Sequence, residues 1–109
     1  MTGSATPSRQ AQIFSALGDE QRLTLLDRLG RGAESASTLA APMIISRQAV
    51  VKHLKQMEAA GLVGTRRSGR EVLYEVRAEG LQQPTEWLTE HANAWRRRLR
   101  DVKSRAETD

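Results

Sequence analysis

The chain has 109 residues and contains no cysteine, only two histidines, and only two Trp, one Tyr and one Phe. Without cysteine it can form neither a disulfide framework nor a thiolate metal site. Residues 1–9 are polar and lack the apolar core of a signal peptide, and no apolar run approaches the length of a membrane span. The chain also lacks a Gly-rich phosphate loop and a plausible Ser/His/Asp grouping. These absences predict a cytoplasmic protein that is neither an enzyme nor bound to a membrane.

The length corresponds to one domain with a short tail before it. Residues 1–8 are rich in Gly, Ser, Thr and Pro and are predicted to be a disordered tail, whereas residues 9–106 form the domain. Because only 39% of the residues are hydrophobic and few are aromatic, the core is small. Association with a second copy would enlarge it.

The first half of the chain has the apolar spacing of short helices. Two are predicted over residues 9–17 and 19–29, the second capped by Asp19, and a third, over residues 37–41, begins at Ser37 and ends before Pro42. Ile13, Phe14 and Leu17 share one face of the first helix, and the buried positions predicted for the second are Leu23, Leu26 and Leu29.

A capped helix is predicted over residues 46–60. Ser46 is a suitable N-cap, Val50, Leu54 and Met57 share one face at i, i+4 and i+7, and Gly61 ends the helix. With that face buried, a second group of side chains points outward from the first turns, near a helix N-terminus that favours phosphate. These are Arg47, Gln48, Val51, Lys52 and Lys55.

A basic hairpin follows. Residues 62–63 and 72–76 have the composition of two strands, and Ser68-Gly69 supplies a turn between them. Arg66, Arg67 and Arg70 are therefore predicted to crowd the hairpin tip, over residues 66–70.

The net charge of the chain is concentrated in this region. Residues 44–77 hold seven Lys or Arg against three acids, a net charge of +4, whereas the remaining residues hold ten of each sign. A helix with a polar outer first turn followed by an Arg-rich hairpin favours double-stranded DNA as the partner. Any one of these basic residues, taken alone, is equally typical of a solvated surface.

The last predicted helix, residues 81–106, carries an apolar seam in alternating steps of four and three residues, which is typical of the 3.5-residue repeat of helices that pack on a partner helix. Periodicity alone allows the seam to pack on its own domain or on a second copy, and the small core favours the second copy. The seam consists of Leu88, Ala92, Trp95, Leu99, Val102 and Ala106. Basic residues also occupy most positions from Arg96 to Arg105, where a solvated face is favoured over DNA contact.

Four segments together resemble the ArsR-type winged-helix repressors of bacteria and archaea. They are ALGDEQR (16–22), residues 46–54, EAAGLV (58–63) and LYEV (73–76). The resemblance implies a mainly α fold with a small β-hairpin wing (α+β), a winged helix-turn-helix that dimerises through its first and last helices. The predicted dimer interface is Ile13, Phe14, Leu88, Ala92, Trp95, Leu99 and Val102. A two-fold dimer places its two copies of helix 46–60 roughly 34–36 Å apart, which implies an inverted-repeat operator.

The metal sites of the family are not matched. Residues 38–42, TLAAP, stand where one site has cysteines, and aligning the other site on His91 gives Thr89, His91, Val102 and Arg105, with one ligand of four. The sequence therefore predicts no metal and no cofactor, and resembles a metal-independent branch whose small-molecule or protein effector is unidentified. Trp87 and Trp95 suit either dimer-core packing, which is favoured, or an apolar ligand cavity. For His53, packing or a backbone hydrogen bond is favoured over phosphate contact.

These observations predict a homodimeric repressor that acts by occupying its operator, with helix 46–60 in the major groove and wing 66–70 on the adjacent groove or backbone. The predicted DNA-binding residues are Ser46, Arg47, Gln48, Val51, Lys52, Lys55, Arg66, Arg67 and Arg70. Two alternatives remain, a metal-responsive repressor with a non-standard site and a winged-helix protein-interaction module. The polar first turn of helix 46–60 disfavours the second, because Arg47 and Gln48 are poor anchors for an apolar interface.

Overall fold

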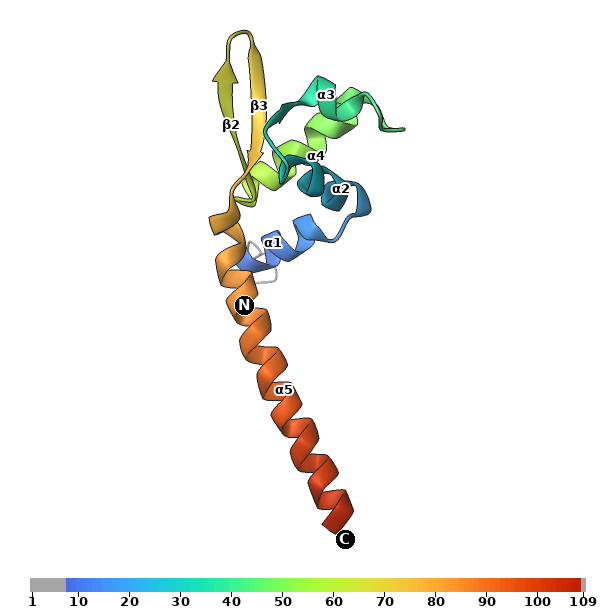
Figure 1. Ribbon diagram of the computed structural model, residues 1–109, viewed down its shortest axis with the longest axis vertical. Helices are drawn as coiled ribbons and strands as arrows, with labels where there is room; N and C mark the ends of the chain where they lie inside the picture. Colours follow the sequence, from blue (N-terminus) through green and yellow to red (C-terminus); the bar gives the residue numbers. More distant parts are fainter. Residues whose placement is uncertain (1–7, 109) are drawn as a thin grey trace, which may run out of the picture.

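The computed structural model describes residues 8–108 and is mainly helical with one small antiparallel sheet (Figure 1). The predicted disordered tail, residues 1–8, lies outside the described residues except for Ser8. The elements in chain order are α1 (Arg9–Leu17), α2 (Glu20–Leu29), β1 (Glu34–Ser35), α3 (Ala36–Ala40), α4 (Arg47–Ala59), β2 (Val63–Ser68), β3 (Glu71–Val76), the 3-10 helix η1 (Ala78–Leu81) and α5 (Gln82–Thr108). The predicted winged helix-turn-helix is confirmed.

Side-chain caps fix where the helices begin. Ser8 accepts a hydrogen bond from the backbone N–H of Ala11 at α1, and Asp19 and Ser46 cap α2 and α4 in the same way. The predicted start of α3 is wrong, because Ser35 rather than Ser37 is its N-cap, with Ser35 Oγ 3.2 Å from the Thr38 nitrogen. Ser35 therefore ends β1 and begins α3 at once.

The core lies where α2, α3 and α4 meet the sheet. Its fully buried side chains are Val50, Leu54 and Met57 of α4, as predicted, together with Leu25, Leu39, Leu62 and Val63. The prediction for Leu23 is wrong: it is 47% exposed, whereas Leu25 is fully buried. The inward face of α2 is displaced by one residue because a buried arginine, Arg22, shares it with Leu25 and Leu29.

The wing is longer and its turn tighter than predicted. Strands β2 and β3 pair from Val63–Val76 to Ser68–Glu71, so that only Gly69 and Arg70 form the turn. Gly69 has φ +63°, the conformation that glycine adopts at the first central position of a type II′ turn. Arg66 and Arg67 therefore lie in β2, and of the three predicted tip arginines only Arg70 occupies the turn. The two-residue strand β1 pairs with the other edge of β3 and was not predicted.

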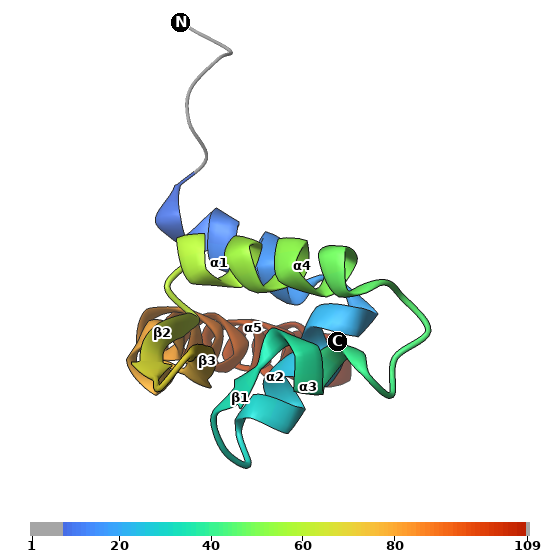
Figure 2. The same ribbon diagram turned by 90° about the horizontal axis from the view of Figure 1, so that it is seen from above.

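Helix α5 leaves the body as a long rod, with the hairpin at the opposite end of the molecule (Figure 1). Its contacts with the rest of the chain are made chiefly with α1 and η1, near its beginning. Viewed from above, α1 and α4 run side by side along one edge of the body (Figure 2). Helix α1 thus stands between α4 and α5.

Candidate nucleic-acid interface

The N-terminal half of α4 presents polar side chains to solvent. Ser46 accepts a hydrogen bond from the Ala49 N–H at 3.1 Å, which orders the first turn and leaves Arg47 and Gln48 exposed. Lys52 and Lys55 are also exposed, and Val51 is half-buried between them and the core. The outward face predicted for this helix is therefore present as a surface of charged and amide groups around one apolar side chain.

A hollow of about 550 Å³ lies between α4 and the wing. Arg47, Val51 and Lys55 line it from the helix, and Arg70 lines it from the hairpin turn. Four of the predicted DNA-binding residues, from two segments that are distant in sequence, thus face the same concavity. Glu58 and Glu71 also line it, so the cations of the hollow stand beside two carboxylates.

The other predicted residues lie outside this hollow. Arg66 Nε is 3.0 Å from Glu75 Oε1 across the β2–β3 pair, and both side chains are about half exposed, at 54% and 40%. A phosphate must compete with Glu75 for that guanidinium. Arg67 is exposed on the same strand, and Ser46, Gln48 and Lys52 are exposed on α4 without lining the hollow.

Arg22 is a buried residue behind α4 whose role in the packing the sequence analysis did not identify. It is 9% exposed and makes hydrogen bonds to two helices. Nε donates to Ala16 O at 2.6 Å and Nη2 to Ser15 O at 3.2 Å, which satisfies carbonyls at the end of α1. Nη1 donates to Gln56 Oε1 of α4 at 2.9 Å. The signal was the position of Arg22 at i−3 and i−7 from the buried Leu25 and Leu29.

His53 joins the same network. Its Nδ1 is 3.2 Å from Arg22 Nη1, which can only donate, so Nδ1 accepts and Nε2 carries the proton. Nε2 lies 3.2 Å from Gln21 Oε1, an acceptor, which fits that neutral form. The partners are side chains of α2 and not backbone groups, so of the two arrangements favoured for His53 the structure has packing within the domain. Nearby, the Arg22 and Gln21 backbone N–H groups hold the pKa of Asp19 below its usual value of 3.8.

The apolar seam of α5 is open in the single chain. Leu88 and Trp95 are each 49% exposed, Leu99 69% and Val102 61%, so the chain itself does not cover the seam. Ala92 is half-buried. The assignment of Ile13 to the interface is wrong, because Ile13 is 3% exposed and belongs to the core of its own chain.

An aromatic cluster connects this seam to α1. Phe14 meets Trp87 edge to face with ring centroids 5.9 Å apart, and Trp87 stacks on His91 at 4.0 Å. Trp95, also on α5, makes edge contacts with the rings of Trp87 and His91. His91 Nδ1 donates to Trp87 O at 2.8 Å, so this imidazole is oriented by its own helix. Among residues 8–108 no three His, Asp or Glu side chains gather as a metal site, and no helix there is long and apolar enough to cross a membrane.

The chain is similar to known regulators along most of its length. A family model for a helix-turn-helix domain matches residues 17–66. The transcriptional repressor SmtB homolog of Synechocystis sp. is 41% identical over 66 residues, which are 61% of this chain and 50% of that protein. The structure of an ArsR-like transcriptional regulator from Rhodococcus sp. RHA1 is 40% identical, with a TM-score of 0.77, over 88% of this chain and 91% of that one.

A second solved structure, of an ArsR family transcriptional regulator, is 30% identical with a TM-score of 0.74, over 82% of this chain and 98% of that chain. The match to the SmtB homolog spans half of that protein's length, but the matches to the two solved regulators span nearly all of theirs. The resemblance carried by residues 16–22, 46–54, 58–63 and 73–76 is thereby confirmed. This chain belongs to the ArsR family of winged helix-turn-helix transcriptional regulators.

Proposed function

We propose that this protein is a sequence-specific, double-stranded DNA-binding repressor that acts in the cytoplasm as a homodimer by occupying its operator. The observation that carries the proposal is the hollow in which Arg47, Val51 and Lys55 of α4 face Arg70 of the wing. A helix in the major groove with a hairpin beside it contacts base edges and backbone together. The relatives support repression over activation, because the Synechocystis protein is named a transcriptional repressor.

The exposed side chains of α4 divide by chemistry. Arg47 and Gln48, in the first turn, have the forked donors and the amide that read guanine and adenine, and Val51 offers an apolar contact to a thymine methyl. Lys52 and Lys55 carry ammonium groups, and Arg67 and Arg70 of the wing carry guanidinium groups; both kinds of cation suit phosphate. Arg66 contributes less than the other two wing arginines because Glu75 holds it.

The dimer follows from the open seam. Leu88, Trp95, Leu99 and Val102 lie on one side of α5 and are exposed in the single chain. Burying them against a second copy supplies apolar area that the small core lacks. A two-fold axis then presents two copies of α4 to an inverted repeat with half-sites roughly 34–36 Å apart. The proposed repressor binds no metal, and its effector is a small molecule or a protein.

Fluorescence anisotropy of the purified protein tests the proposal, with DNA from upstream of its own gene and a scrambled duplex, at low and physiological salt, with and without chelator. We expect selective binding that chelator does not change. Gln48→Ala should reduce discrimination by about 1–3 kcal/mol per half-site contact while non-specific binding persists. Gln83→Ala, an exposed glutamine on α5, is the matched control. Equal losses on both duplexes would remove Gln48 from base reading, and loss of binding with chelator would restore the metal-sensor alternative.

A further inference from the structure

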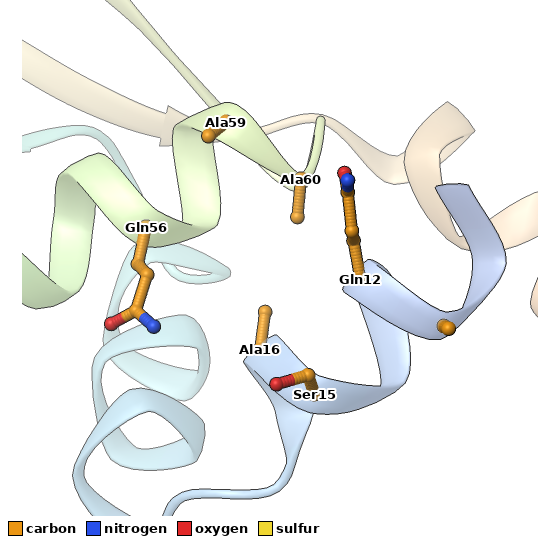
Figure 3. Close-up of a pocket in the computed structure, with 7 residues that line it drawn as sticks. Gln12, Ser15, Ala16, Gln56, Ala59 and Ala60 are labelled. Atoms are coloured by element: carbon orange, nitrogen blue, oxygen red, sulfur yellow. The ribbon is translucent and has the colours of Figure 1, made fainter. Parts of the chain in front are cut away.

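A small groove separates the last turn of α4 from α1 on the side away from the wing (Figure 3). Its volume is about 230 Å³. Helix α1 contributes one wall and α4 the other, and small side chains on both helices leave the space between them unfilled. The lining residues are Ala11, Gln12, Ser15, Ala16, Gln56, Ala59 and Ala60.

The lining specifies the chemistry of an occupant. Four of the seven residues are alanines and none is charged, so a charged ligand would have no counter-ion. Gln12, Ser15 and Gln56 supply amide and hydroxyl groups around this apolar surface. Figure 3 shows the amide nitrogen of Gln56 on the side of Ala16 and its oxygen turned away. Among the described residues that nitrogen makes no hydrogen bond to protein, whereas the oxygen accepts from Arg22.

The volume limits the size of the occupant. An apolar cavity of about 150 Å³ holds a benzene ring. A groove of about 230 Å³ therefore accommodates one six-membered ring with a short polar substituent. An acceptor on that substituent can take a hydrogen bond from Gln56 Nε2, and the ring can lie against the alanines.

Arg22 connects the groove to the part of α4 that carries the proposed DNA-reading residues. Three of its lining residues, Ser15, Ala16 and Gln56, are hydrogen-bonded to the Arg22 guanidinium. The same guanidinium contacts His53, one turn before Gln56 on α4. A molecule that widens the groove must stretch the bonds that hold α4 to the end of α1, and α4 is the helix that carries Arg47, Gln48 and Val51.

We propose that this α1–α4 groove is an effector site for a neutral monocyclic aromatic compound bearing one amide or hydroxyl group, and that occupancy changes DNA affinity through Arg22. The regulatory half of this inference rests on the proposed function, whereas the binding half does not. The groove uses neither the Trp87 and Trp95 cluster nor any histidine ligand.

Benzamide is a suitable probe because it combines one ring with one amide. Two-dimensional amide NMR of the full-length protein, without DNA, should show saturable shifts at Ala11, Gln12, Ser15 and Ala59 with a dissociation constant of about 1 mM, as expected for a molecule of this size. Ala59→Leu should weaken binding by at least about tenfold, because the larger side chain fills the exposed end of the groove. Ala78→Leu, at an exposed alanine outside the groove, is the control and should bind benzamide like the wild type.

Regulation is measured separately, by anisotropy with operator DNA. Saturating benzamide should change operator affinity in the wild type and in Ala78→Leu, and not in Ala59→Leu. The binding site is refuted if shifts are absent, do not saturate, fall elsewhere, or persist in Ala59→Leu. Saturable binding with unchanged operator affinity would refute coupling through Arg22. If no DNA sequence binds, the proposed function fails while the NMR result still decides whether the site exists.

Discussion

Replacing Arg22 tests the network that attaches the reading helix to α1. In Arg22→Ala, Ala16 O loses its only hydrogen bond among residues 8–108, whereas Ser15 O keeps the Gly18 N–H at 3.1 Å. A buried carbonyl left unsatisfied costs about 1–3 kcal/mol. Loss of the packed apolar stem adds roughly 1 kcal/mol. Gln56 and His53 are accessible enough to regain water, so the expected total is about 2–4 kcal/mol.

Urea unfolding at fixed protein concentration, followed by circular dichroism, measures this loss. With a slope of about 2 kcal/mol per molar urea, the midpoint should fall by roughly 1–2 M. Arg22→Lys keeps the charge, but its single ammonium group cannot make the hydrogen bonds of the three guanidinium nitrogens. Its urea midpoint should therefore lie between those of the wild type and the alanine variant. Arg31→Ala, an exposed arginine just after α2, should stay within about 0.5 kcal/mol of the wild type.

A change for Arg22→Ala no larger than that of Arg31→Ala would refute the reasoning. It would mean that removing a buried charge without a carboxylate partner offsets the lost hydrogen bonds. A second readout separates stability from positioning. Under conditions where Arg22→Ala is folded, its operator affinity should still be reduced, because Gln56 and His53 no longer fix α4 against α1.

Three further predictions concern the cap, the wing and the seam. The pKa of Asp19 is lower in the folded state than in the unfolded chain, so the ionised carboxylate stabilises the fold above the unfolded pKa, and this contribution is lost as the pH falls through the folded pKa. The difference in unfolding free energy between wild type and Asp19→Asn should therefore shrink below about pH 4, as measured by unfolding at a series of acidic pH values. Glu75→Gln should free Arg66 and tighten operator binding at low salt by up to about tenfold, an effect that Arg66→Gln should abolish in the double variant. Leu99→Glu should shift sedimentation toward monomer, while Arg97→Glu, on the opposite side of α5, should not; equal shifts would count against the seam.

Much of the fold was predictable because local signals agreed with tertiary packing. The caps at Asp19 and Ser46 and the apolar spacing of Val50, Leu54 and Met57 are each sufficient to place a helix, and the structure has those helices at the expected residues. The wing was placed correctly but its strands were drawn too short. Arg66 and Arg67 are charged yet extend β2, because an exposed strand face carries charges without cost.

One error arose because a polar side chain occupied a position that hydrophobic periodicity assigns to an apolar one. Arg22 lies on the inward face of α2, so counting leucines shifted that face to Leu23. The two-residue strand β1 has no periodicity to detect, and it exists because β3 offers it an edge. Ile13 was assigned to a dimer surface because the resemblance implies pairing through the first helix, which does not show which side of that helix faces the core of its own chain.

Helix α1 lies beside the dimer seam, the groove and the DNA-reading helix α4. One side of α1 meets α5 through Phe14 and Trp87, where a second copy would pack. Its C-terminal carbonyls bind Arg22, which in turn binds the middle of α4. A displacement of α1, whether caused by a ligand in the groove or by a change at the dimer seam, must therefore alter the same hydrogen bonds. Gln56 and His53 are accessible to water, so their hydrogen bonds to Arg22 are the ones that a small binding energy can exchange, and their exchange can move α4.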